Sequence, residues 1–280
     1  MAFERHPAFT PAPNPESRLW RYMSVPKYLS LIQRSGLFLS SLELMALTDP
    51  FEGSLPLSKF RHRDWNSRED IPEQILPKLP GYFEAVGLKH YRDLVEHDIR
   101  RSFAFRRSYF INCWHINEHE SAAMWDIYSR RDEGIAIVSS ESRIESALID
   151  WGNPIYGGCV TYGDYMKADL EFDEWFAFTP ILHKRVDFAY EKEYRLVYWD
   201  SSVTHKDGSG STLVERELKE IEQQKVVPGH YVSCDLRKMI EAIYVSPLAK
   251  DWFLEIVTHV SESAGLPTPI KSELLAEPLR

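Results

Sequence analysis

The hydrophobic pattern is clearest between residues 119 and 140, which read HESAAMWDIYSRRDEGIAIVSS. Apolar positions recur at helical spacing as far as Tyr128, and an unbroken apolar run follows Gly134. The spacing predicts a short helix, and the run predicts a strand that is buried on both faces. Trp125 and Tyr128 end this helix beside a tight turn. We interpret them as pocket-lining residues, with ordinary core packing as the alternative.

A second pattern lies between residues 189 and 199, which read AYEKEYRLVYW. It predicts a strand in which Glu191, Glu193 and Arg195 point to one face. Burying two carboxylates is costly without compensating cations, and the nearby candidates are Arg195 and the pair Lys184–Arg185. We expect this strand and the helix–strand unit at 119–140 to form the walls of one pocket. The alternative is a charged edge strand that discourages aggregation.

The remaining pattern places these walls in one α+β domain that spans residues 19–265. Further strands are predicted at 19–23, 37–40, 109–114, 155–162 and 241–246, and helices at 24–35 and 248–263. We expect a central mixed or antiparallel sheet with flanking helices. Residues 57–107, which are polar and helical in pattern, are expected to form an insertion over one face of the sheet. Residues 1–18 are expected to be a loose arm, and residues 266–280 a weakly ordered tail.

A loop is predicted at residues 42–56. Asp49 precedes Pro50, and a residue before proline avoids helical geometry. Phe51 can anchor the loop in the core while Asp49 and Glu52 remain polar. A structural turn and a pocket-forming loop are both consistent with this pattern, since loops on rigid scaffolds often carry function.

Composition argues against a nucleic-acid-binding, a metal-binding and a membrane-spanning protein. The chain has 280 residues, a net charge of −9, and 8 Trp, 14 Tyr and 14 Phe, which favour an aromatic-lined site over a general nucleic-acid-binding surface. The three cysteines show no disulfide or zinc spacing, and the grouping of Cys113, His115 and His119 lacks a second cluster, so we expect no metal. No apolar run approaches the roughly 18 residues of a membrane helix, and no signal-peptide core is visible. We therefore expect a cytoplasmic protein with no membrane partner.

The segment Thr48–Glu52 resembles the F-N-D-P-F-E loop of an uncharacterised bacterial domain-of-unknown-function family. The chain departs from that family at Leu47–Thr48, where Phe-Asn is more usual, and at Trp114–His115, where Phe-Ser is more usual. The resemblance covers roughly residues 19–260. Its other motifs are an opening strand and helix with a Tyr-Arg pair, a W-x-x-Y…G segment (Trp125, Tyr128, Gly134) and an E-x-E-x-R strand (Glu191, Glu193, Arg195).

More distantly, the layout is similar to ADP-ribosyltransferase folds. The resemblance implies that Arg21 on the first strand holds a dinucleotide. It also implies that Ser139–Ser140, or Tyr128 in their place, line the nicotinamide pocket. The late glutamate would be Glu193, with Glu191 as its companion. This likeness concerns the fold, and a fold by itself does not define an activity.

The resemblance implies NAD as a substrate, no metal, and cleavage of the nicotinamide glycosidic bond. Glu193 would stabilise the oxocarbenium-like transition state, and Glu191 would orient or deprotonate the acceptor. Arg21 would bind phosphate, and Tyr128 or Trp125 would stack on nicotinamide. The full set of binding candidates is Arg21, Tyr22, Trp125, Tyr128, Ser139, Ser140 and Arg195, with Asp49, Phe51 and Glu52 in the loop.

Two other functions are open from the residues alone. One is a non-catalytic module that binds a nucleotide or nucleic acid. The other is a metal-dependent phosphoesterase or nuclease built on Asp49, Glu191 and Glu193. No motif identifies the acceptor of any ADP-ribose, which could be a protein or a nucleic acid. Nor does a motif distinguish a toxin, a defence effector and a housekeeping factor.

Overall fold

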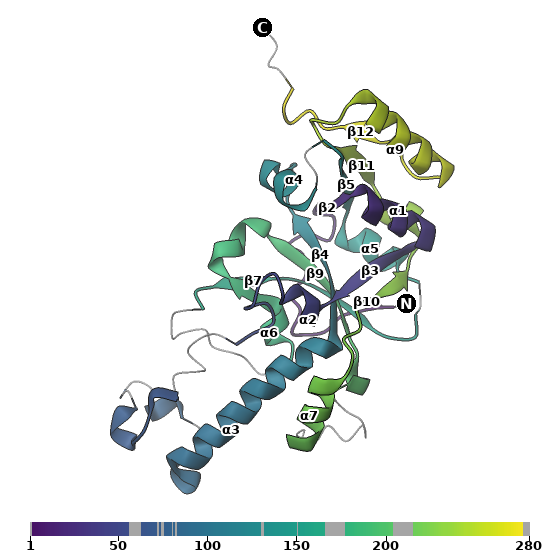
Figure 1. Cartoon of the computed structure of the whole chain (residues 1–280). Coiled ribbons are helices and arrows are strands. Elements are labelled where there is room, and N and C mark those ends of the chain that lie inside the picture. The colour runs from purple at the N-terminus through teal and green to yellow at the C-terminus, as the bar shows by residue number, and fades with distance from the viewer. Residues whose placement is uncertain are drawn as a thin grey trace.

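The computed structural model describes residues 2–276, except 56–62, 72, 74–75, 80, 82, 130–131, 150, 166–176 and 204–214. Several predicted segments are affected: the last residue of the loop at 42–56, residues 57–62 and five further positions of the insertion at 57–107, and residues 277–280 of the tail lie outside the described residues. Figure 1 shows a central sheet with helices on both faces and a long helix, α3, that extends away from it.

Most of the described strands belong to one ten-stranded sheet. Its main order is β1 (Phe3–Glu4), β6 (Ile155–Cys159), β9 (Glu193–Trp199), β4 (Tyr109–Ile116), β2 (Leu19–Ser24), β5 (Gly134–Ser139), β11 (Ala242–Val245) and β12 (Ile270–Lys271). The strand β3 (Gly36–Ser41) pairs with β4 and with β10 (Gly229–Ser233). The short strands β7 (Thr161–Gly163) and β8 (His183–Arg185) pair separately in parallel. Parallel contacts occur at β1–β6 and β11–β12, and the other pairs in the large sheet are antiparallel, so the expected mixed sheet of an α+β fold is confirmed.

Residues alternate between the two faces of this sheet, and each face has its own core. The main-core face carries Leu19, Trp114, Ile137 and Leu196. The helices that cover it are α1 (Val25–Arg34), α5 (Glu141–Ala147), α8 (Leu236–Met239) and α9 (Asp251–Ser263). The second face carries Trp20, Val138, Ile111 and Val197, and its helices are α2 (Leu42–Met45), α4 (Ala122–Tyr128) and α6 (Thr179–Leu182). The candidate site described below lies on the second face.

The N-terminal arm is ordered, in contrast to the loose segment expected from its prolines. The strand β1 pairs with β6, and Ala2, Phe3, Phe9 and Ala12 are buried. Gly157 allows this close approach, because a Cβ atom there would lie 2.6 Å from a ring atom of Phe3. The apolar residues of the arm are too few to show periodicity, yet they fill the edge of the sheet.

Glu141 connects the arm to the body. Its side chain is fully buried, it accepts the N–H of Ala12 at 2.6 Å, and it pairs with Arg5. Replacing Glu141 by Ala is expected to lower the free energy of unfolding by about 1–3 kcal/mol, because the buried Ala12 donor loses its acceptor. Hydrogen exchange at the Ala12 amide should accelerate.

The matched control is Glu145, which also pairs with Arg5, at 2.7 Å, but is 35% exposed. Glu145→Ala is expected to change the free energy of unfolding by less than about 1 kcal/mol, as for other exposed ion pairs. Equal effects of the two variants on Ala12 exchange would show that Glu141 does not anchor the arm.

The insertion is helical, as expected, but its long helix does not lie over a face of the sheet. The helix α3 (Phe83–Phe105) bends at Gly87, whose φ is 75°, and points away from the sheet in Figure 1. Its last turn packs through Ala104 against α7 (Glu215–Gln223), where Leu218 and Ile221 are buried. The insertion therefore makes its own small cores rather than extending the main one.

The C-terminal part also differs from the sequence prediction. The tail pairs with the sheet through β12, instead of being weakly ordered over its whole length. In α9, Phe253 and Val257 face the core, while Trp252 and Ile256 are about half exposed, at 50% and 51%. The two apolar rows are neighbours on one helix, so their spacing alone could not identify the buried row.

Candidate functional site

The E-x-E-x-R segment contains a change of backbone direction that its sequence pattern conceals. Glu191 ends the 3₁₀ helix η5 (Val186–Glu191), Lys192 is left-handed with φ 39°, and the strand β9 begins only at Glu193. The prediction of one continuous strand through Glu191 was therefore wrong. The expected convergence of Glu191, Glu193 and Arg195 is nevertheless confirmed, because the kink turns the Glu191 side chain toward the strand.

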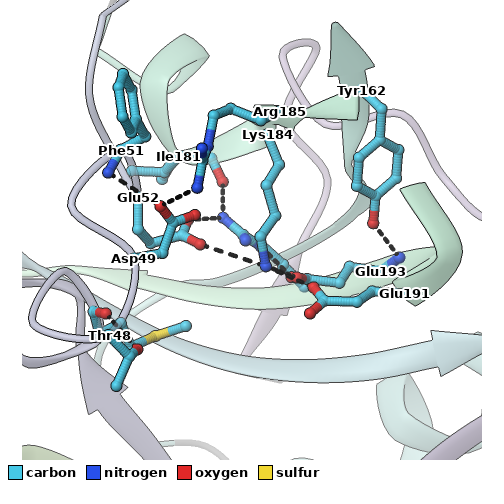
Figure 2. A network of polar contacts seen from close by, with 12 residues as sticks. Thr48, Asp49, Phe51, Glu52, Tyr162, Ile181, Lys184, Arg185, Glu191 and Glu193 are labelled. Carbon is cyan, nitrogen blue, oxygen red and sulfur yellow. Dashed lines mark hydrogen bonds and ion pairs between the residues drawn. The ribbon is translucent and has the colours of Figure 1, made fainter. Parts of the chain in front are cut away.

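Lys184 lies at the centre of this convergence (Figure 2). Its Nζ is 2.5 Å from Glu191 Oε2, 2.7 Å from Glu193 Oε1 and 3.6 Å from Glu52 Oε2. All four side chains are at most 8% exposed. The ammonium group thus occupies the space among three carboxylates, as a bound cation would.

Arg195 provides the second compensating cation. It is fully buried, and its guanidinium donates from Nε to Glu193 Oε2 at 2.6 Å and from Nη1 to Glu52 Oε1 at 2.7 Å. The carbonyl of Ile181 accepts a further bond from Nη1 at 2.7 Å. These bonds fix Glu193 and Glu52 on either side of one planar group.

The loop predicted at 42–56 contributes the outer part of the cluster. Asp49 Oδ1 accepts from Arg185 Nη2 at 2.9 Å and from the amide of Phe51 at 3.1 Å. The guanidinium of Arg185 lies over the ring of Phe51, 4.6 Å from its centroid. Phe51 is only partly buried and serves as a platform for Arg185 rather than as a core anchor, while Glu52 enters the buried centre.

The four carboxylates of the cluster are in different electrostatic environments. Glu193 and Glu52 each pair with Arg195, Asp49 pairs with Arg185, and Glu191, among the described residues, pairs with Lys184 alone. Arg106 adds a positive charge near Asp49 and Glu52. Burial together with the neighbouring Glu193 raises the pKa of Glu191 to about 7. Burial alone would also raise the pKa of Glu193, but Arg195 and Lys184 hold that pKa well below its usual value. Glu191 is therefore the member of the pair that takes up a proton near neutral pH, while Glu193 stays ionised.

This division of protonation gives a pH-dependent stability. The folded-state pKa of Glu191, about 7, lies above its unfolded value of 4.5, so unfolding releases a proton between these values. Raising the pH from about 4.5 to 7 is therefore expected to favour unfolding, by on the order of 3 kcal/mol at about 1.4 kcal/mol per pH unit. Glu193, with its lowered pKa, contributes in the opposite direction and below this window.

Urea denaturation of the wild type and of Glu191→Gln at several pH values tests this expectation. The glutamine variant should lose the decline between pH 4.5 and 7 while keeping the acid-side loss caused by Glu193. Parallel stability curves for the two proteins would contradict the assignment of the proton to Glu191.

Aromatic side chains surround the acid pair. Tyr128 donates its hydroxyl to Glu191 Oε1 at 2.6 Å and is 42% exposed, so it lies between the pair and solvent. The ring of Phe188 lies 4.7 Å from Lys184 Nζ, and the hydroxyl of Tyr162 accepts the amide of Glu193 at 2.8 Å. An ionised and a protonated carboxyl group, at the edge of an aromatic surface, can act as a stabilising charge and an acid or base.

The pocket-lining residues predicted around α4 are only partly brought to this site. Tyr128 reaches Glu191. Trp125 is buried, packs edge-on against Tyr22 at 5.0 Å, and donates its indole N–H to Glu120 at 3.0 Å. Tyr22 lies on the second face, with its hydroxyl bound to the amide of Ser121. Trp125 and Tyr22 thus support the wall behind Tyr128.

Three other candidates lie away from the acid pair. Trp20, His115 and Glu193 lie opposite one another on adjacent strands and therefore share the second face. Arg21 is the next residue after Trp20, so its side chain points to the main-core face. Ser139 donates to the carbonyl of Met239 at 2.6 Å. Ser140 caps the first turn of α5. Both serine hydroxyls are therefore engaged in hydrogen bonds to the backbone.

Sequence reasoning missed several contributors. Tyr162 and Phe188 were not singled out, and His115 was named only in a possible metal grouping and as a departure from the family's usual Phe-Ser. Their roles depend on strand pairing and on the kink at Lys192, which leave no spacing signal. The described residues contain no group of three or more His, Cys, Asp or Glu side chains that could hold a metal ion.

Comparison with known proteins adds no identification. No protein-family model matches the chain, and no significant match is found among curated proteins or solved structures. Within the described part of the chain, no helix has both the length and the apolar character needed to cross a bilayer.

Proposed function

We propose that this protein binds NAD and cleaves its nicotinamide glycosidic bond, by hydrolysis or by transfer of ADP-ribose to an acceptor. The observation that carries the proposal is the buried pair Glu191 and Glu193: Lys184 Nζ lies 2.5 Å from one carboxylate and 2.7 Å from the other, and only Glu193 also pairs with Arg195, at 2.6 Å. These contacts separate the pKa values of the two groups, raised for Glu191 and lowered for Glu193. Two carboxyl groups with different protonation are the recurring equipment for breaking glycosidic bonds.

The roles follow from the contacts of each carboxyl group. In the proposed reaction the C1′–N bond breaks, and nicotinamide leaves with the bonding electrons. Glu193 stabilises the positive charge that develops on the ribose. One oxygen of Glu193 accepts a hydrogen bond from Lys184, and the other accepts one from Arg195. A carboxylate oxygen can accept a second hydrogen bond, which a ribose hydroxyl would donate.

Glu191 is the proposed base. A pKa of about 7 leaves a large fraction ionised at neutral pH, while keeping enough basicity to accept a proton. It would take that proton from water or from an acceptor hydroxyl as the new C1′–O bond forms. Tyr128, which touches Glu191 and is partly exposed, is the residue best placed to contact the departing base.

Arg21 faces the side of the sheet opposite Glu193, so it enters the proposal only as a contact for the phosphate end of a ligand that extends past the end of the β2–β4 ladder. Burial lowers its pKa to about 10, its Nη1 has no hydrogen-bond partner, and no carboxylate among the described residues pairs with it. It lies over Trp114 and near Lys27, whose pKa is lowered by burial and by the charge of Arg21. The strands β2 and β4 pair only at Leu19 and Trp20, so the ladder ends next to Arg21. A phosphate there would supply the lacking counter-charge.

The direct test is incubation of purified protein with NAD, with mass spectrometry of the products in the presence and absence of cell extract. Release of nicotinamide together with ADP-ribose or an ADP-ribosylated acceptor is the expected result. No release under any acceptor condition would overturn the proposal.

The second candidate is a module that binds a nucleotide without turnover. It is favoured by the ion pairs with Lys184 and Arg195, which engage both carboxylates of the site. A rise in melting temperature with NAD, without any product, would select this function. The metal-dependent phosphoesterase finds no comparable support, because the Lys184 ammonium already lies among the carboxylates that would bind the metal.

A further inference from the structure

His115 is the buried residue of the site that the proposed reaction does not yet use. It lies on β4 directly opposite Glu193, on the second face of the sheet, and is 3% exposed. Its Nδ1 is 2.6 Å from the carbonyl oxygen of Glu191. A carbonyl oxygen only accepts, so Nδ1 carries the hydrogen and donates it.

The hydrogen bond from His115 is made at the backbone kink between Glu191 and Glu193. The carbonyl of Glu191 is the last of η5, and the next residue, Lys192, is in the left-handed region that side-chain-bearing residues seldom adopt. The carbonyl of Lys192 accepts from the amide of Ile116, the neighbour of His115. Two consecutive residues of β4 therefore hold the turn that separates the two carboxylates.

We propose that His115 is a positioning residue for the carboxylate pair: by donating Nδ1–H to the Glu191 carbonyl, it fixes Glu191 against Glu193 and Lys184. The inference concerns the geometry of the site and rests on the proposed function only for its activity measurement. It assigns His115 a role through Glu191, without contact to the substrate.

The neutral form of His115 suits this role. Burial lowers its pKa, with Lys192 acting in the same direction and the Glu191 carbonyl opposing it. The neutral ring with hydrogen on Nδ1 leaves a lone pair on Nε2, which has no hydrogen-bond partner among the described residues. The ring of Tyr22 lies beside it, 6.4 Å between centroids.

The pKa of the Glu191 carboxyl group depends on the groups around it, so a change in this pKa shows that the side chain has moved. The groups that face its carboxyl are Lys184 from β8, Glu193 from β9, Tyr128 from α4 and Tyr190 from η5. Tyr162 from β7 and Arg195 lie beyond them, next to Glu193. None of these groups is removed by a substitution at position 115, so a change in the titration reflects displacement of Glu191 itself.

The test compares His115→Leu, which removes the donor, with His115→Asn, whose side-chain amide can donate from nearly the same place. In protein with ¹³C-carboxyl-labelled glutamate, the resonance that titrates near pH 7 is assigned by its loss in Glu191→Gln. The leucine variant is expected to lower this midpoint by about one pH unit or more, as Glu191 relaxes toward water. The asparagine variant should keep it close to the wild-type value.

Ser139→Ala is the matched control. Ser139 also donates from a buried side chain to a backbone carbonyl, but on the other side of the sheet. It should lose stability without moving the Glu191 midpoint. An unchanged midpoint in a folded leucine variant, or an asparagine variant as displaced as the leucine variant, would overturn the proposal.

A measurement on the wild type keeps the proposal testable if the leucine variant does not fold. Long-range ¹H–¹⁵N spectra distinguish the two neutral tautomers, and the Nδ1–H form is expected for His115 at neutral pH. The Nε2–H form would overturn the proposal without any variant.

The activity measurement separates this inference from the proposed function. If NAD is consumed, the leucine variant is expected to turn over about tenfold to a hundredfold more slowly at pH 7, with a shifted pH profile, and asparagine should restore most of the rate. If NAD is not consumed, the proposed reaction fails, while the NMR titration still decides the role of His115.

Discussion

Replacing Glu193 by Gln is expected to reduce NAD turnover by about a thousandfold, because the substitution removes the charge that stabilises the oxocarbenium-like transition state. Glutamine has nearly the same shape, and Arg195 retains Glu52 as a partner at 2.7 Å, so the fold should persist. Nicotinamide release, measured at saturating NAD and again at low NAD, separates a loss of kcat from a loss of binding.

The matched control for this variant is Glu52→Gln. Glu52 is equally buried, and it also contacts Lys184 and Arg195, so the same negative charge is removed from the same cluster. It bears no role in the proposed reaction, and its turnover should fall by less than about tenfold. Similar losses in the two variants would mean that the charge balance of the cluster, and not Glu193 in particular, governs the reaction.

The largest effect on stability is expected at Arg195. Replacing it by Met leaves Glu193 and Glu52 with Lys184 as their remaining cation, and it removes the donor of the Ile181 carbonyl. The free energy of unfolding should fall by about 3–5 kcal/mol, as is usual when one member of a buried ion pair is removed. Chemical denaturation near neutral pH measures this loss directly.

Arg185→Met provides the comparison for Arg195→Met. Arg185 is 28% exposed and pairs with Asp49 at the edge of the cluster, so water can replace much of its interaction. Its loss should cost about 1 kcal/mol. Equal losses at positions 185 and 195 would contradict the view that Arg195 is the buried centre of the site.

For the acid cluster, the sequence predicted the residues that meet but not the backbone conformation that brings them together. The alternation of Glu191, Glu193 and Arg195 predicted that they converge, and the cost of burying carboxylates made Lys184, Arg185 and Arg195 the candidate partners. Lys184 and Arg195 do pair with the two glutamates, whereas Arg185 pairs with Asp49 instead. The kink at Lys192 could not be predicted, since a left-handed lysine carries no sequence signal and is imposed by bonds from β4.

The assignment of Arg21 shows the limit of motif order. A cation on the first strand and a glutamate on a late strand suggested one shared pocket. Strand pairing instead directs Arg21 and Glu193 to opposite faces, because a shift of one residue along a strand reverses the face. The roles proposed for Arg21 and for NAD remain predictions, to be decided by the turnover and binding experiments.

The sequence by itself determined the α+β class, most of the strands and helices of the domain, and the residue types of the charged cluster. These depend on local periodicity, on capping and on the desolvation of charge, which neighbouring residues largely decide. Only the tertiary structure decided the docking of residues 2–18, the buried row of α9, the positions of His115 and Tyr162 beside the acid pair, and which of the two glutamates has the raised pKa. These depend on partners far away in the chain, because strand register, burial and the local charge balance exist only once the sheet has formed.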